Sequence, residues 1–250
     1  MARLRPMPPI DIDLGELTAF GKQWAVKQSL SRTPPHSSSQ LGYLFDRAVG
    51  ASLSTMLGGI PIIKPNARAL VAAQTDCVEV GHVRIIGGVR AQNFDVGYRP
   101  DGVRFAFDSK TLNDTKSVGK NWQNMINDVA TEATTVHSRF PYAVVGFMVI
   151  IPSQCISVSR RSTMIETMER LARRLGVEDP LYMAEAISFV LWNPEDGTIS
   201  ETIPRPESPL RIERFSSFVE AAYVSRYKGL PPHAIAEEVD EGDDEPDEDS

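Results

Sequence analysis

The chain has 250 residues, of which 42% are hydrophobic and 24% are charged, a balance typical of a packed globular protein and not of a disordered or fibrous chain. Its longest apolar run, residues 142–152, is too short to cross a bilayer, and no apolar stretch follows the N-terminal arginines as a secretion signal would. The chain has only two cysteines, without CxxC spacing, which argues against a disulfide framework, and we therefore expect the protein in the cytoplasm. Its formal net charge is −7.

Hydrophobic spacing predicts a helix over residues 11–30, where Leu14, Leu17, Phe20 and Trp24 recur at helical intervals. A loop rich in proline and serine leads into a second predicted helix over residues 40–57, and this helix ends at Gly58 and Gly59. Strands are predicted at residues 77–80 and 83–86 (counted as one bent strand), 92–98 and 103–109, followed by a helix over 119–137 and a buried strand over 143–151. The predicted order is therefore helix, three strands, helix, strand.

The remainder of the chain predicts additions to this order. A basic helix over residues 160–175 carries five arginines that could lie along DNA: Arg160, Arg161, Arg170, Arg173 and Arg174. A strand pair is predicted around residues 186–203, with its turn at 193–197, and a helix over 212–226. From residue 231 the chain is acidic and poor in apolar residues, so we expect it to be disordered.

The acidic tail also hides the charge of the rest of the chain. Residues 237–249 contain ten carboxylates and no cation, which leaves 26 basic against 23 acidic residues elsewhere. The remaining charge of about +3 is compatible with binding a polyanion but does not require it.

The most informative stretch is a predicted hairpin with a type I turn at residues 99–102. With Arg99 facing Gly102, Asp95 faces Ala106, and alternation makes one face apolar throughout. The apolar face consists of Phe94, Val96, Tyr98, Val103, Phe105 and Phe107. On the other face Asp95 and Asp108 are diagonal neighbours about 7–8 Å apart, and Lys110 follows in the same row.

This second face suits phosphodiester hydrolysis. Two carboxylates could converge on one hard divalent cation, which neutralises charge and acidifies a water molecule. A lysine beside them could take or steer the proton of the attacking water. The alternative is the solvated outer face of an amphipathic hairpin, on which aspartate and lysine are common. The four histidines (His36, His82, His137 and His233) show no HxH or HExxH spacing, which disfavours a histidine metal site.

The hairpin and the order of elements resemble the PD-(D/E)xK nuclease superfamily, which includes the type II restriction endonucleases. Asp95 takes the place of the first acid, and Asp108-Ser109-Lys110 that of the (D/E)xK tripeptide. Two departures are that Phe94 stands where the motif has proline, and that the tripeptide carries aspartate where glutamate is commoner. The resemblance covers residues 38–152.

The resemblance implies an α/β fold with a restriction-endonuclease-like core, α-β-β-β-α-β, whose mixed sheet is flanked by helices, with added helices and a β-hairpin. The corresponding domains are an N-terminal helical arm (residues 1–37), the nuclease core (38–152), a C-terminal extension packed on the core (153–230) and a disordered acidic tail (231–250). Catalysis would fall to Asp95, Asp108 and Lys110. Mg²⁺, for which Mn²⁺ could substitute, would be bound by Asp95, Asp108 and the carbonyl of Ser109, with Asp46 as an auxiliary ligand or an ordinary surface acid.

The polar loop after the tripeptide leads into a helix N-terminus, a favourable place for a phosphate. Residues that could contact nucleic acid there, or form an ordinary solvated helix start, are Lys116, Lys120, Asn121, Gln123 and Asn124. Gln123 could alternatively point toward the active site, as polar residues of this helix do in some relatives.

The function that the resemblance implies is a Mg²⁺-dependent endonuclease acting on DNA, in bacterial restriction or anti-phage defence, as a homodimer or a subunit of a defence complex. One alternative is a non-catalytic nucleic-acid-binding or assembly module with the same fold. Another is the nuclease subunit of a larger transposase or helicase-coupled complex, whose motor would be a separate chain.

Overall fold

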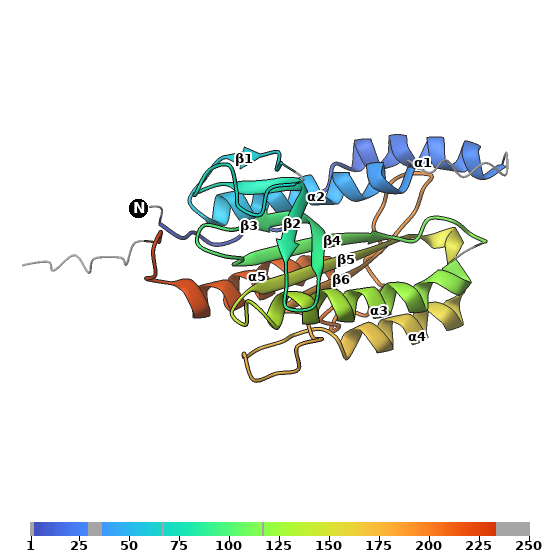
Figure 1. The fold of residues 1–250 in the computed structure, drawn as a ribbon. Helices are drawn as coiled ribbons and strands as arrows, with labels where there is room; N and C mark the ends of the chain where they lie inside the picture. The colour runs from blue at the N-terminus through green and yellow to red at the C-terminus, as the bar shows by residue number, and fades with distance from the viewer. Residues whose placement is uncertain (1–2, 30–36, 67, 117, 234–250) are drawn as a thin grey trace, which may run out of the picture.

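A six-stranded mixed sheet with helices on both faces forms the centre of the computed structural model, which describes residues 3–29, 37–66, 68–116 and 118–233 (Figure 1). The helices are α1 (Leu14–Ser29), α2 (Ser37–Met56), α3 (Val118–His137), α4 (Val158–Glu169) and α5 (Ile212–Tyr227). The strands are β1 (Ile62–Ile63), β2 (Val78–Ile86), β3 (Ala91–Tyr98), β4 (Phe105–Thr111), β5 (Val144–Pro152) and β6 (Ala186–Trp192). A single 3₁₀ turn, Ser153–Cys155, follows β5. No described helix is long and apolar enough to cross a membrane.

The sheet joins an antiparallel part to a parallel part. Its strand order follows the chain from β1 to β6, and β2, β3 and β4 form an antiparallel meander. The strands β4, β5 and β6 run parallel, and α3 makes the crossover between β4 and β5. Apart from the two-residue β1, the order from α2 to β5 is helix, three strands, helix, strand, as the hydrophobic pattern predicted. The two-residue β1, beside β2, was not predicted.

Each face of the sheet has its own hydrophobic core. On one face α3 and α4 pack against residues such as Val145 and Phe147 of β5. On the other face α2 and α5 pack against residues such as Val144 and Met148. Because both faces are covered, every residue of β5 is buried, which explains why its sequence is a continuous apolar run.

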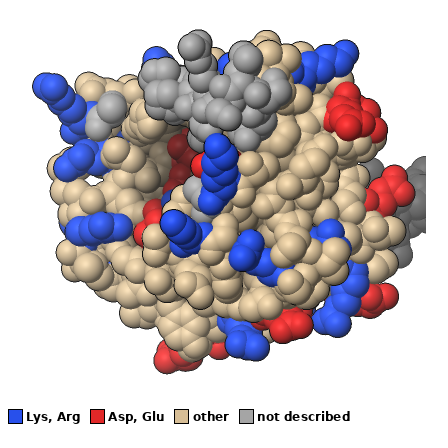
Figure 2. Space-filling view, turned by 90° about the vertical axis from the view of Figure 1, so that its right-hand side faces the viewer, with Lys and Arg blue, Asp and Glu red and all other residues tan. Residues whose placement is uncertain are grey.

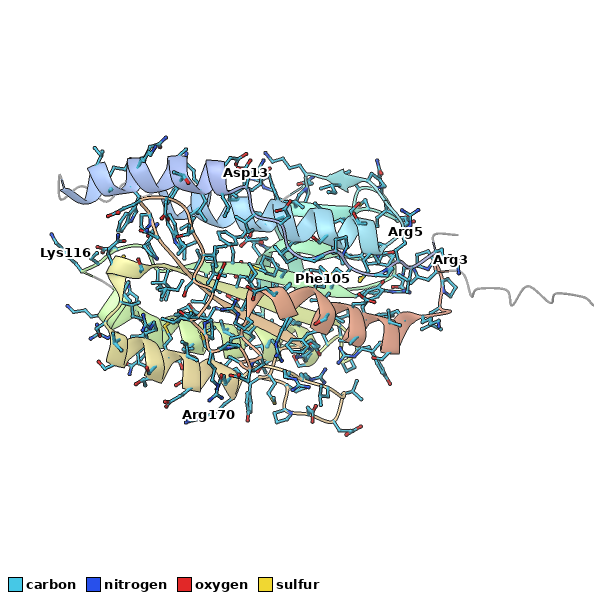
Figure 3. All side chains as sticks on the ribbon, turned by 180° about the vertical axis from the view of Figure 1, so that it is seen from behind. Arg3, Arg5, Asp13, Phe105, Lys116 and Arg170 are labelled. Atoms are coloured by element: carbon cyan, nitrogen blue, oxygen red, sulfur yellow. The ribbon has the colours of Figure 1, made fainter. Side chains whose placement is uncertain are left out.

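The C-terminal part of the chain differs from the prediction in two ways. Instead of forming a separate hairpin, β6 joins the main sheet beside β5, and after the turn at residues 193–197 the chain returns through a single bridge between Trp192 and Ile199. The predicted basic helix is also shorter, because α4 ends at Glu169. The helix keeps Arg160 and Arg161, and Arg170 is exposed directly after its end (Figure 3). Arg174 lies beyond the helix and is buried, so the five arginines do not form one basic face.

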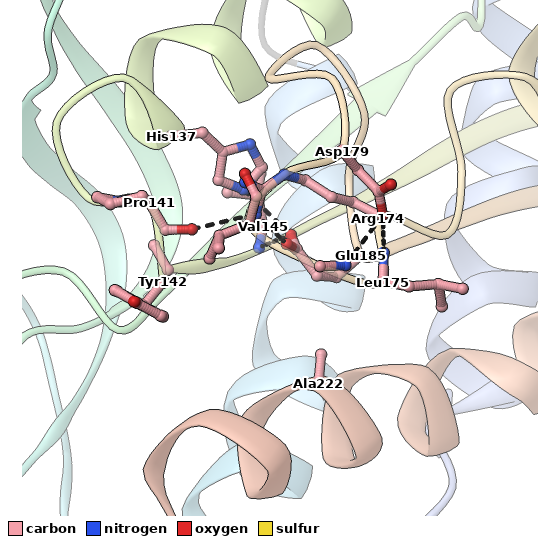
Figure 4. A network of polar contacts seen from close by, with 12 residues as sticks. His137, Pro141, Tyr142, Val145, Arg174, Leu175, Asp179, Glu185 and Ala222 are labelled. Atoms are coloured by element: carbon pink, nitrogen blue, oxygen red, sulfur yellow. Dashed lines mark hydrogen bonds and ion pairs between the residues drawn. The ribbon is translucent and has the colours of Figure 1, made fainter.

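Arg174 instead belongs to a buried charged network around Glu185 (Figure 4). The Glu185 carboxylate accepts hydrogen bonds from Arg174 at 3.1 Å, from Arg226 at 2.8 Å and from the backbone N–H of Val145 at 2.8 Å. The Nε2 atom of His137 lies 3.2 Å from the same carboxylate. Despite its burial, the pKa of Glu185 is lowered, because His137 and Arg226 stabilise the charged form.

The hairpin between β3 and β4 has a wider loop than predicted. Tyr98 pairs with Phe105 and Val96 with Phe107, so the connection runs over residues 99–104 instead of a four-residue turn. Arg99 turns inward to hold Glu79 through two hydrogen bonds of 2.7 and 2.8 Å, which takes it out of the ladder. The register moves by two residues, so each side chain keeps its predicted face while its partner across the hairpin changes.

The predicted tail begins later than residue 231. Pro231 accepts a hydrogen bond of 2.6 Å from Arg104, and His233 is buried with its Nε2 2.7 Å from the Tyr223 hydroxyl. The chain is therefore packed as far as residue 233, and residues 234–250, which hold the ten clustered carboxylates, lie outside the described residues.

Candidate active site

The candidate site lies where β3 and β4 separate. Their ladder ends at the pair Val96 and Phe107, and the next pair in this register would be Asp95 and Asp108. The Asp95 carboxylate enters the gap instead and accepts hydrogen bonds from the Ser109 backbone N–H at 3.0 Å and the Ser109 hydroxyl at 3.1 Å. Asp95 and Asp108 also share a hydrogen bond. The two acids thus face each other directly, where the sequence predicted diagonal neighbours.

A third carboxylate, Asp46, comes from α2 on one side of the sheet. A Cβ atom at Gly42 would lie 2.6 Å from the Ser109 hydroxyl, so the glycine lets α2 approach β4 closely. Asp46 is one turn further along the helix, is 5% exposed and hydrogen-bonds the Ser109 side chain. Its Oδ1 atom is buried without a hydrogen-bond partner. Asp46 is therefore part of the cluster, and the interpretation as an ordinary surface acid is wrong.

A fourth carboxylate, Glu132, comes from α3 on the other side of the sheet. The Lys110 ammonium donates hydrogen bonds to Asp108 and, at 2.7 Å, to Glu132. The second oxygen of Glu132 is buried without a partner. Glu132 was not predicted from the sequence, although an acid between Val129 and Ala133, on the apolar stripe of the predicted helix, was a usable signal.

Burial and mutual repulsion disfavour ionisation of Asp46, Asp95 and Asp108. Burial, followed by the neighbouring Asp108, raises the pKa of Asp95 to about 8. Burial raises the pKa of Asp108 to about 6, although Lys110 partly offsets the effect. The pKa of Asp46 is raised well above its usual range by burial and by the nearby charge of Asp95. The positive charge near these three carboxylates is therefore too small to keep all of them ionised.

Lys110 remains protonated in this environment. Burial alone would lower its pKa, but the carboxylates of Asp108 and Glu132 outweigh that effect and raise it. A lysine held in this form donates hydrogen bonds and does not accept a proton. Its chemistry here is to orient and stabilise a negatively charged or developing oxygen, not to act as a base.

The cluster opens into a cavity of about 520 Å³ between α2, β2 and β4. Asp46, Asp95, Asp108 and Lys110 line it, together with residues at the N-terminal end of α2. The face of the molecule at the right of Figure 1 shows acidic atoms recessed in a hollow, with several Lys and Arg side chains near its rim (Figure 2).

One histidine also lines the cavity. The register of β2 shifts between Val80 and Val83, and this bulge turns His82 outward at the cavity wall. Gly81, beside it, has a φ of 132°, which favours glycine. His82 carries no recognisable spacing in the sequence, so only the bulge brings it to the site.

The residues predicted to contact nucleic acid lie apart from the carboxylates. Lys116 is exposed on the loop after β4, at one end of the molecule (Figure 3). Lys120, Asn121, Gln123 and Asn124 are exposed on the first turns of α3. None of the five lines the cavity, so Gln123 does not point into it, and Glu132 is the residue of α3 that reaches the site. Glu79 of β2 is paired with Arg99 and does not line the cavity.

Within the described ranges, no group of three or more His, Cys, Asp or Glu side chains is arranged to hold a metal ion. Comparison of the chain with protein-family models, with curated proteins and with solved structures gave no match.

Proposed function

We propose that the protein is a Mg²⁺-dependent endonuclease that hydrolyses phosphodiester bonds in DNA, with a centre of the PD-(D/E)xK kind. The observation that carries the proposal is the pair Asp95 and Asp108, opposed on adjoining strands beside Lys110 in one cavity. The order of elements from α2 to β5 supports the same conclusion. Asp95 on β3 and the tripeptide on β4 would correspond to the two parts of that superfamily's motif.

The donor atoms of the site fit a magnesium ion. Mg²⁺ prefers oxygen ligands, is usually bound through one or two carboxylates and keeps several water molecules. Asp95 and Asp108 would supply the carboxylates, so a third acidic ligand is not required. The Ser109 N–H points at Asp95, and since the N–H and C=O of a strand residue face the same neighbouring strand, its carbonyl also faces the gap.

The charge of the cluster fits a cation as well. Among the described residues the cluster holds four carboxylates, those of Asp46, Asp95, Asp108 and Glu132, and one lysine, which contacts Asp108 and Glu132. The unpartnered Oδ1 atom of Asp46 and the raised pKa of Asp95 are what a missing positive charge would leave behind. Asp46 would act through the second coordination sphere, by accepting a hydrogen bond from the water molecules around the ion.

When bound, the ion supplies positive charge to the scissile phosphate and lowers the pKa of a water molecule. The chain's own residues do the rest. Asp95 and Asp108 would hold the ion, and Asp46 can accept a proton near the cavity. Lys110, held between Asp108 and Glu132, donates hydrogen bonds toward the phosphate oxygens as their charge increases.

The DNA backbone would extend from the cavity toward Lys116 and Lys120 at the N-terminus of α3. Two exposed lysines at a helix start favour a phosphate. Restriction or anti-phage defence, a homodimer and a place in a larger complex remain predictions from the resemblance. A non-catalytic binding module is the less favoured alternative, because a module without catalysis has no use for an unbalanced buried cluster.

Incubation with supercoiled plasmid DNA tests the proposal. The protein should nick or linearise the plasmid with Mg²⁺ or Mn²⁺, and EDTA should stop the reaction. An Asp108→Asn variant purified in the same way controls for contaminating nucleases. No cleavage by the folded protein with either ion, on plasmid or on single-stranded circular DNA, would contradict the proposal.

A further inference from the structure

A second hollow adjoins the active-site cavity. It measures about 440 Å³ and is lined by Tyr43, Arg47, Ile62, Ile63, Lys64, Val80 and Gly81. Tyr43 and Gly81 also line the active-site cavity, so the two hollows meet at these residues. Together they form a path from the carboxylates along α2 and past β1, and we call the second hollow the side groove.

The side groove exposes an aromatic ring whose position is held. Tyr43 is 50% exposed, and the Arg47 guanidinium lies 5.6 Å from the centre of its ring. Arg47 is itself tied to Glu16 of α1 at 2.5 Å. Beside them Ile62 is 47% exposed. An exposed aromatic ring next to a guanidinium is the usual surface on which proteins stack a nucleic-acid base.

The charge of the side groove differs from that of the cavity. Arg47 and Lys64 line it, and none of its described lining residues is acidic. His82 stands next to Gly81, where the two hollows meet. The path thus joins a carboxylate cluster, suited to a cation, to a basic stretch, suited to phosphates. An exposed ion pair such as that between Arg47 and Glu16 contributes little, so a phosphate can replace its acidic partner.

We propose that the side groove binds an unpaired stretch of the DNA strand next to the scissile phosphate, with one base stacked on Tyr43 and the backbone held by Arg47 and Lys64. A base within an intact duplex is already stacked on both faces and is not free to stack on a side chain that lines a groove. The side groove therefore selects single-stranded, frayed or flipped-out DNA. This inference rests on the proposed nuclease function and adds the form of its substrate.

Fluorescence anisotropy in EDTA, which prevents cleavage, measures this binding directly. The probes are a labelled single-stranded DNA of about 12 nucleotides and the duplex of the same sequence. Tyr43→Ala should weaken single-strand binding by about tenfold, and Tyr43→Phe should restore it because the ring is kept. Lys64→Ala should weaken it by a few-fold. Lys228→Ala is the matched control, because this exposed lysine lines a separate hollow with Arg3 and Arg5.

Duplex affinity should change by less than about twofold in Tyr43→Ala, since phosphate contacts dominate it. Equal single-strand affinities for Tyr43→Ala and the unaltered protein would overturn the inference, as would an equal loss for single strand and duplex. The outcomes separate the two proposals. If the protein cleaves plasmid but Tyr43→Ala has no effect on single-strand affinity, only the side-groove inference fails. If Tyr43→Ala weakens single-strand binding but the protein does not cleave, only the proposed nuclease activity fails.

Discussion

Two clusters of buried charge that adjoin the same sheet are built in opposite ways. Around Glu185, one carboxylate is surrounded by Arg174, Arg226 and His137, and its pKa is lowered. Around Asp95 and Asp108, four carboxylates share a single lysine, and the pKa of Asp95 is raised to about 8. The first cluster is balanced by the chain itself, and the second is not.

The difference indicates different roles. A protein that can surround Glu185 with donors has the means to neutralise a buried carboxylate where only stability matters. Leaving Asp46, Asp95 and Asp108 together costs free energy of folding, and such costs concentrate at functional sites. The unbalanced cluster is therefore the candidate for chemistry, and the balanced one is structural.

The largest expected effect is on cleavage. Asp108→Asn and Lys110→Met should each reduce plasmid cleavage by about 10³-fold or more, because each removes a group that contacts the ion or the phosphate. The fold should persist, as judged by circular dichroism. Asp128→Asn on the exposed side of α3 is a matched control and should cleave normally. If Asp108→Asn cleaved plasmid at the rate of the unaltered protein, the cluster around Asp95 and Asp108 would not be catalytic.

The next effect is on stability and concerns the balanced cluster. Glu185→Gln leaves Arg174 and Arg226 buried without a counter-charge, so the free energy of unfolding should fall by about 3 kcal/mol. Urea denaturation measures this change. Cleavage per folded molecule should stay the same, and a specific loss of cleavage without destabilisation would show that Glu185 is not a structural group.

Asp95→Asn should have the opposite effect on stability. Because the folded pKa of Asp95 is raised to about 8 from about 3.9 in the unfolded chain, the folded state binds the extra proton. The stability that protonated Asp95 contributes is therefore fully present below about pH 4 and is lost as the pH rises through about 8. Asparagine mimics the protonated form, so the variant should be more stable at pH 8, by about 2 kcal/mol, and equal near pH 4.

Denaturation midpoints of the unaltered protein and of Asp95→Asn at pH 4, 6 and 8 measure this difference in stability. A variant that is less stable than the unaltered protein at pH 8 would mean that Ser109 satisfies the Asp95 carboxylate as fully as the arginines satisfy Glu185.

The sequence predicted the order of the main elements and placed Asp95, Asp108 and Lys110 on one face, because alternation and the tripeptide are local signals. It also named Asp46 as a possible further member of the site. It did not predict that Asp95 and Asp108 stand opposite each other, since the register depends on Arg99 turning inward to Glu79, a long-range contact. Glu132 and His82 reach the site only through helix packing and a bulge. The balanced cluster was also missed, because its members come from separate parts of the chain.

The smallest effect concerns the exposed lysines, which belong to neither cluster. Lys116→Ala and Lys120→Ala should weaken DNA binding for all sequences and make its salt dependence shallower by about one unit for each lost phosphate contact. Affinities at several salt concentrations, with Lys228→Ala as the matched control, measure the slope. An unchanged slope in the double variant would show that the DNA follows another surface.

Calorimetric titration of the protein with Mn²⁺ and Mg²⁺ measures whether the unbalanced cluster takes up the positive charge that it lacks. The intact protein should bind a divalent ion, and Asp108→Asn should bind it at least about tenfold more weakly. Glu185→Gln, if it remains folded, should bind the ion normally. Absence of binding to the intact protein at millimolar concentrations, or equal binding by Asp108→Asn, would contradict the account.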